Sequence, residues 1–111
     1  MMNIDIIQEG KRVFYEEIEA LNNSISFIDE SFVESVRLIS TSNKIVLSGV
    51  GKSGLIARKI AATLSSLGIS STFLHPVEAL HGDIGLVQKD DCAILLSKSG
   101  TTEELTMMIP Y

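Results

Sequence analysis

Two short stretches combine glycine with hydroxyl side chains in a pattern that proteins use to hold phosphate. Residues 49–54 read GVGKSG and residues 97–102 read SKSGTT, and each stretch directly follows an apolar run. A glycine-rich turn that leads into a helix exposes backbone N–H groups, and these bind anions together with nearby hydroxyls. We therefore expect both stretches to contact one compact phosphate dianion. Either stretch taken alone is also typical of ordinary caps and turns.

The first stretch resembles two nucleotide-binding motifs, and its surroundings argue against both. Gly49, Gly51 and Gly54 satisfy the G-x-G-x-x-G spacing of dinucleotide sites. The acidic residue that should then end the next strand is missing, because residues 73–76 read FLHP. A nucleoside triphosphate loop needs a glycine five residues before Gly51, where Val46 stands. A sugar phosphate is the remaining ligand class.

A parallel α/β sheet would bring the two stretches together. After an N-terminal helical part, the apolar pattern predicts a strand, a helix, a second strand, a third strand and a last helix. This order predicts a parallel α/β sheet with right-handed crossovers. Ligands of such sheets bind outside the carboxyl ends of the strands. The predicted strands are 45–47, 71–74 and 92–96.

Local signals define where the predicted helices begin and end. Residues 3–41 carry a helical apolar pattern that weakens at 22–24 and resumes over 30–39. Ser53 is the expected N-cap of the helix after the first strand, and Gly68 is the expected C′ residue. Residues 77–90 are expected to be irregular or briefly helical.

The composition predicts one small globular domain from the cytoplasm. The chain has 111 residues, 45% hydrophobic and 21% charged, and a net charge of −5, which argues against nucleic-acid and acidic-membrane partners. The single cysteine, Cys92, excludes an internal disulfide and is expected to be a buried structural thiol in a reducing compartment. We find neither a signal-peptide pattern nor a stretch long and apolar enough to span a membrane.

Three motifs together resemble the SIS (sugar isomerase) domain, most closely the arabinose-5-phosphate isomerase family. They are GVGKSGLIARKIAATLSSLG, HPVEALHGDIG and SKSGTTEEL, within a match over residues 44–110. The resemblance implies that 44–111 is the N-terminal half of a SIS domain, truncated after the third strand. It also implies a three-layer open parallel sheet with flavodoxin-like strand order 2-1-3. Residues 1–43 would be a helical segment that packs on this domain or on a partner subunit. The parent protein would often carry paired CBS modules.

The resemblance implies an aldose–ketose isomerase that interconverts arabinose 5-phosphate and ribulose 5-phosphate through an enediol. The product would supply the octulosonate sugar of lipopolysaccharide or capsule, and this chain alone would have little activity. The alternative is a non-catalytic SIS module that senses a sugar phosphate or a nucleotide sugar. We expect no cofactor. His75, His81 and Asp83 could bind a metal, but their spacing matches no strong signature, so we expect no required metal. The exposed edge of strand 92–96 favours a homo-oligomer, a dimer or a tetramer.

The resemblance also assigns the residues that would hold the phosphate. The S-x-S-G-x-T loop implies that Ser97, Ser99 and Thr102 bind the phosphate, with help from Gly51 and Ser53 in the first stretch.

The implied catalytic cluster is Lys52, His81 and Glu104. Glu104 would be the base, Lys52 would polarise the carbonyl or neutralise the enediolate, and His81 would move protons between oxygens or open the sugar ring. Each residue has another interpretation. Glu104 completes a capping box with Thr101, Lys52 fits an exposed helix start, and His81 could brace a loop through Asp83.

Overall fold

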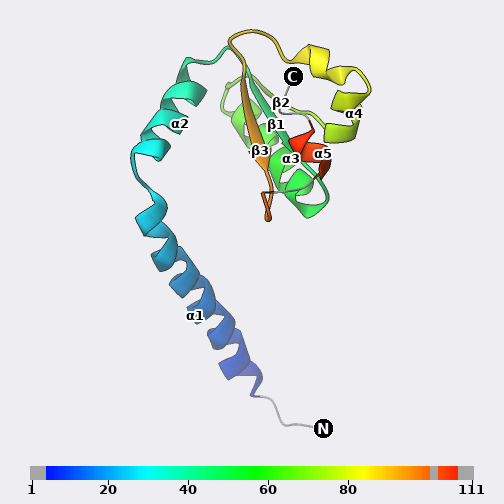
Figure 1. Ribbon diagram of the computed structural model, residues 1–111. Helices are drawn as coiled ribbons and strands as arrows, with labels where there is room; N and C mark the ends of the chain where they lie inside the picture. Colours follow the sequence, from blue (N-terminus) through cyan, green and yellow to red (C-terminus); the bar gives the residue numbers. More distant parts are fainter. Residues whose placement is uncertain (1–4, 101–102, 108–111) are drawn as a thin grey trace. The chain divides into compact units, whose positions relative to one another are not determined.

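The computed structural model describes residues 5–100 and 103–107, with the backbone alone at positions 104 and 105 (Figure 1). The chain forms two compact units, Met1–Val36 and Arg37–Tyr111, which we describe separately. In chain order the elements are α1 (Ile6–Ser24), η1 (Ile25–Phe27), α2 (Glu30–Thr41), β1 (Ile45–Gly49), α3 (Lys52–Ser66), β2 (Ser71–Phe73), α4 (Pro76–Leu80), η2 (Asp83–Leu86), β3 (Cys92–Leu96) and α5 (Glu103–Thr106).

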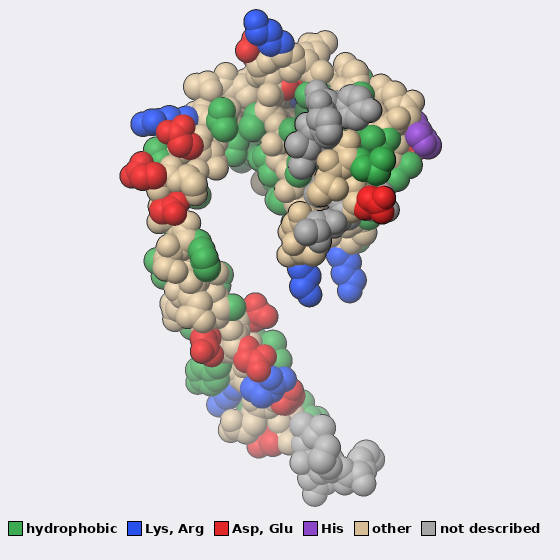
Figure 2. Space-filling model, viewed as in Figure 1, with side chains coloured by type: hydrophobic (Ala, Val, Ile, Leu, Met, Phe, Trp, Pro, Cys, Tyr) green, Lys and Arg blue, Asp and Glu red, His purple; other side chains and the backbone are tan. Residues whose placement is uncertain are grey.

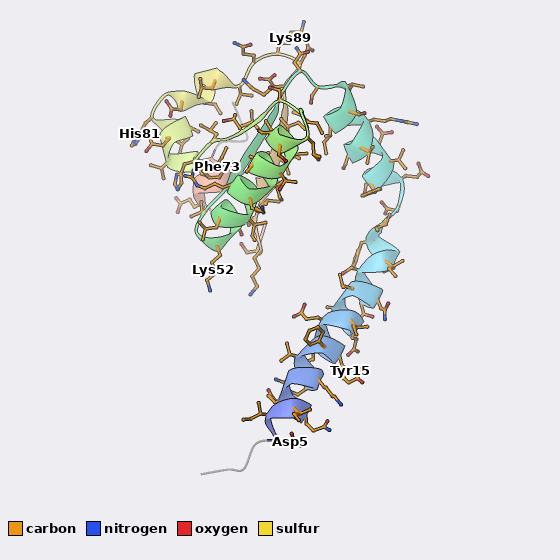
Figure 3. The ribbon with its side chains drawn as sticks, turned by 180° about the vertical axis from the view of Figure 1, so that it is seen from behind. Asp5, Tyr15, Lys52, Phe73, His81 and Lys89 are labelled. Atoms are coloured by element: carbon orange, nitrogen blue, oxygen red, sulfur yellow. The ribbon has the colours of Figure 1, made fainter. Side chains whose placement is uncertain are left out.

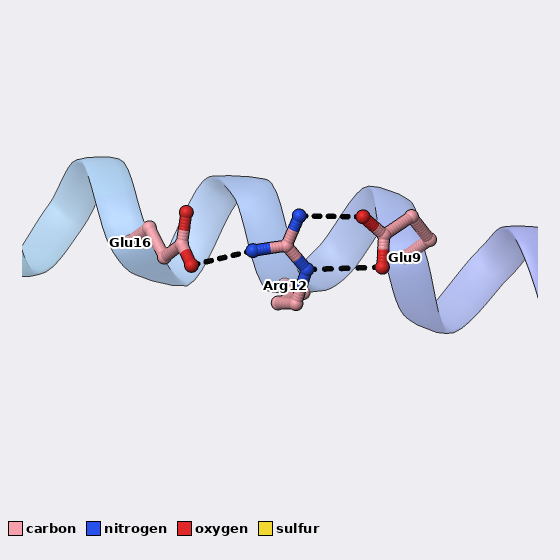
Figure 4. Close-up of polar contacts among 3 residues, drawn as sticks. All are labelled: Glu9, Arg12 and Glu16. Carbon is pink, nitrogen blue, oxygen red and sulfur yellow. Dashed lines mark hydrogen bonds and ion pairs between the residues drawn. The ribbon is translucent and has the colours of Figure 1, made fainter.

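The first unit is held by local helical interactions. Asp5 caps α1 by accepting hydrogen bonds from the N–H groups of Ile7 and Gln8. Arg12 bridges Glu9 and Glu16 along the helix, and its Nε lies 2.9 Å from a Glu9 carboxylate oxygen (Figure 4). The guanidinium of Arg12 lowers the pKa of Glu9. The helix ends at Ser24, where the sequence predicts a weakening.

The first unit has no buried residue in its described part. Every side chain from Asp5 to Val36 is exposed, including large apolar ones such as Phe14 at 73%. Hydrophobic and acidic side chains share the visible surface of α1 (Figure 2). The apolar face of α1 is therefore not covered by other described residues of this unit.

The second unit is the predicted open parallel sheet. The strand order is β2-β1-β3, and both pairings are parallel, which confirms the expected 2-1-3 order. All five residues of central β1 are buried. Ile45 and Leu47 pack with α3 residues, whereas Val46 packs with residues around α4, so helices cover both faces of the sheet.

Both ends of α3 follow from its glycines. The N–H of Gly68 donates to Ser65 and that of Ile69 donates to Leu64, each at 3.0 Å, which confirms Gly68 at the C′ position with φ +81°. The prediction of Ser53 as N-cap is wrong. The chain turns at Gly51, with φ +61°, so the helix already begins at Lys52.

Two smaller expectations also change. The second strand ends at Phe73, one residue earlier than predicted, although the N–H of Leu74 still donates to Leu47 at 2.8 Å. Cys92 is partly exposed rather than buried, because it opens β3 at an edge of the described sheet.

Candidate functional site

The parallel strands bring three loops to one edge of the sheet. Gly49 at the end of β1 pairs with Leu96 at the end of β3, so the loops that follow these strands start side by side. The loop after β2 reaches the same edge because β2 runs parallel to β1. The convergence of Ser53 and Ser99 on one anion remains a prediction. The three loops comprise residues 50–51, 74–75 and 97–100.

The three glycines of the first loop serve different purposes. A Cβ on Gly54 would lie 2.6 Å from the carbonyl oxygen of Gly49, and a Cβ on Gly49 would lie 2.9 Å from the carbonyl carbon of Ser53. The first turn of α3 therefore packs directly on the end of β1. Gly51 has φ +61° and no atom within 4 Å of its Cβ position, so the backbone conformation requires glycine there. The space over Gly51 is open to a ligand.

The start of α3 is suited to an anion. The first turn contains Lys52 and no acidic residue, and the N-cap Gly51 offers no side-chain acceptor to its N–H groups. The positive end of the helix dipole therefore has no competing carboxylate in this turn. Lys52 is exposed and points into solvent from the start of α3, and Ser53 is partly buried beside it (Figure 3).

The third loop is closed by its own first residue. The hydroxyl of Ser97 accepts a hydrogen bond from the N–H of Gly100 at 2.9 Å, and Gly100 has φ +74°. Ser97 is partly buried, and Ser99 is exposed. This turn folds the loop back at the end of β3. Thr102 lies outside the described residues.

Of the predicted catalytic residues, Lys52 and His81 have side chains in the described part of the structure. His81 is exposed at the C-terminal end of α4, where its N–H donates to the carbonyls of Val77 and Glu78. Figure 3 shows Lys52 and His81 at separate places on the second unit, and neither points toward the other. Glu104 belongs to α5, and its side chain lies outside the described part of the structure.

The structure gives His75 and Ser48 roles that sequence reasoning missed. His75 is the N-cap of α4, and its Nδ1 accepts a hydrogen bond from the N–H of Val77 at 3.1 Å. A sequence signal existed, because proline favours the first helical position and so makes the preceding residue the cap. Ser48 is fully buried and its hydroxyl donates to the carbonyl of Leu74. The apolar pattern of the strand does not predict that its serine makes this hydrogen bond.

Other features of the described chain lie outside this edge. A pocket of about 570 Å³ between the end of α2 and the start of β3 includes Asp90, Asp91 and Cys92, at the opposite edge of the sheet. Within residues 5–100 and 103–107, no three His, Cys, Asp or Glu side chains form a group that could hold a metal ion. None of the described helices combines the length and apolar character needed to cross a bilayer.

Among known protein families, the SIS domain matches residues 38–111 of this chain. Arabinose 5-phosphate isomerase KdsD of Pseudomonas aeruginosa is 40% identical over 109 residues, which is 97% of this chain and 33% of that protein. Arabinose 5-phosphate isomerase GutQ of Escherichia coli K12 is 37% identical over 98% of this chain and 34% of that protein. The chain thus spans about a third of the length of these curated relatives.

Solved structures agree with this match. The c3406 protein of Escherichia coli CFT073, solved in complex with arabinose 5-phosphate, superposes with a TM-score of 0.86 and 42% identity over 99% of this chain and 59% of that one. A candidate phosphosugar isomerase involved in capsule formation, from Bacteroides fragilis, has a TM-score of 0.68 and 36% identity over 87% of this chain and 56% of that one. At these identities the match extends beyond the fold alone.

Proposed function

Because this chain belongs to the SIS domain family, we propose that the full-length protein is an aldose–ketose isomerase acting on arabinose 5-phosphate and ribulose 5-phosphate. The observation that carries the proposal is the pairing of Gly49 with Leu96, which starts two phosphate-type loops side by side at one sheet edge. The names of the KdsD and GutQ relatives, and the sugar-phosphate complex of the E. coli protein, support this substrate. By the same likeness, the product would serve octulosonate synthesis for lipopolysaccharide or capsule.

The phosphate would be bound between the first and third loops. Ser97, Ser99 and Thr102 would supply hydroxyls, and the start of α3 at Gly51 and Ser53 would supply N–H groups and a positive dipole end. The open space over Gly51 supports this arrangement, because no atom beyond its chain neighbours lies within 4 Å of its Cβ position.

The reaction moves a proton between adjacent carbons through an enediol. A carboxylate would take the proton from carbon, and Glu104 is the candidate at the start of α5. Lys52 would stabilise the negative charge that develops on the substrate oxygen, a role that its exposed ammonium at the same edge supports. His81 would move the proton between the two oxygens.

The unburied apolar residues of 5–36 support a homo-oligomer, because many large apolar side chains exposed together are normally covered in a stable protein. We propose a division at residues 43/44 into this helical segment and the SIS half-domain. Light scattering of the full-length protein would report the molar mass of a dimer or a tetramer. Phe14→Glu would lower this molar mass.

The test is ketose formation from arabinose 5-phosphate by the full-length protein. Lys52→Ala and Glu104→Gln are each expected to lower kcat by about 10²-fold or more, the usual contribution of a positioned acid, base or charge. Lys59→Ala removes an exposed lysine from the same helix and serves as the matched control. Substrate binding by the wild type without turnover would refute the isomerase and indicate a sugar-phosphate sensor instead.

A further inference from the structure

The peptide that leaves β2 is held on both sides by β1. The N–H of Leu74 donates to the carbonyl of Leu47 at 2.8 Å, and the carbonyl of Leu74 accepts from the hydroxyl of Ser48. Leu74 is itself buried at 4% exposure. The backbone that leads into His75 is therefore fixed relative to the carboxyl edge of the sheet.

The hydrogen bond at His75 requires one tautomer of its imidazole. Nδ1 accepts from the N–H of Val77, and a ring nitrogen that accepts carries no hydrogen. The bond therefore requires the tautomer with its hydrogen on Nε2. The backbone of His75 has φ −70° and ψ 134°, the extended conformation expected before Pro76 at the first helical position.

Aromatic contacts limit the orientation of this imidazole. The ring of Phe73 meets it edge to face, with centroids 6.4 Å apart and planes at 72°. The guanidinium of Arg58 lies 4.0 Å from the centroid of the same Phe73 ring. Because Phe73 also packs in the core beside α3, the stack connects His75 to a rigid part of the second unit.

We propose that His75 is a positioning residue, whose imidazole caps α4 and so fixes the turn that carries His81. Helix α4 has five residues, Pro76–Leu80, and His81 follows directly, so one loosened N-terminal turn displaces most of the element. His75 acts through α4 and does not touch the substrate. The catalytic consequence rests on the proposed function of His81, whereas the cap itself does not.

The cap is tested first without activity, in full-length protein labelled with ¹⁵N at histidine. The spectrum is expected to show Nδ1 of His75 without a hydrogen and Nε2 with one, and a hydrogen on Nδ1 would overturn the proposal. The amide of Ala79 bonds the carbonyl of His75 at 2.9 Å, so its exchange reports opening of the helix. His75→Ala is expected to lower the protection of this amide about fivefold. Unchanged protection would overturn the cap.

Substitutions that match the shape of His75 distinguish a capping role from direct contact with the substrate. In His75→Asn the side-chain oxygen can take the place of Nδ1, whereas in His75→Gln the amide extends past it. With arabinose 5-phosphate, kcat is expected to fall in His75→Gln and His75→Ala at unchanged KM, and to recover in His75→Asn. Recovery in His75→Gln alone would mean a donor to the substrate and overturn the proposal. A wild type without turnover would refute the proposed function, while the spectrum and the exchange would still decide the cap.

Discussion

Gly54→Ala tests the close packing of α3 on β1, on which the geometry of the first loop depends. The new Cβ would lie 2.6 Å from the carbonyl oxygen of Gly49 and 3.2 Å from its carbonyl carbon. Both atoms belong to the backbone of a buried strand, so no flexible side chain can move away. Such overpacking costs up to about 3 kcal/mol. Alanine regains about 1 kcal/mol of helix propensity over glycine, which leaves a net loss of about 2 kcal/mol.

The assay is the thermal midpoint of the full-length protein, followed by circular dichroism. In the complete domain, of which residues 44–111 would be half, a loss of about 2 kcal/mol lowers the midpoint by about 4–8 °C. Gly85→Ala is the matched control, because a Cβ on Gly85 would meet no atom within 4 Å and the residue has no positive φ. Equal midpoints for Gly54→Ala and the control would refute the close approach of α3 to β1.

Three further substitutions test single interactions. Ser48→Ala removes a fully buried hydroxyl bond and is expected to lower the free energy of unfolding by about 1–2 kcal/mol in guanidinium titrations, and no change would contradict the bond. Lys44→Met leaves Asp91, at 4% side-chain exposure, without its ion pair at 3.3 Å. It is expected to lower the free energy of unfolding by about 3 kcal/mol in the same titration, and an unchanged free energy would contradict the pair. Arg12→Gln is expected to raise the pKa of Glu9 toward 4.5 in a carboxyl NMR titration. Because the folded pKa of Glu9 is lowered, its stabilising effect on α1 is present above pH 4.5 and disappears as the pH falls through the lowered value, and a titration unaltered by Arg12→Gln would contradict this pair.

The sequence was sufficient for the sheet because its signals are local and repeated. The apolar run of β1 between polar turns marks a strand covered on both faces, and the alternation of strands and helices predicts the parallel pairing seen in β2-β1-β3. Gly68 was predictable for a similar reason, since few residues other than glycine adopt φ +81° at a helix end. These conclusions needed no knowledge of side-chain contacts.

The start of α3 was not predictable, because two local signals compete there. Serine is a strong N-cap, which favours a helix that starts after Ser53. The backbone turn at Gly51 fixes the start earlier, and that turn exists because Gly49 and Gly54 bring helix and strand into contact. A tertiary contact thus decided a boundary that local preference would have placed elsewhere.

The site was predictable as an edge of the sheet and not as a cluster of side chains. Strand pairing alone brings the first and third loops together, since Gly49 faces Leu96. The place of His81 depends on the length of α4 and on the cap at its start, and neither can be read from the spacing of Lys52 and His81 in the chain. The functional roles assigned to both residues therefore stay predictions.

The glycine motif of the first loop identifies a geometry rather than a ligand. Gly49 and Gly54 allow α3 to approach β1, and Gly51 allows the chain to turn. A dinucleotide site would need glycines with the same roles. What differs is the chemistry that surrounds the loop. The adjacent loop after β3 offers hydroxyls at Ser97 and Ser99, and the end of β2 offers a histidine that is already engaged as a cap. With no carboxylate there to bind a ribose, the pattern favours a small phosphorylated ligand over a dinucleotide.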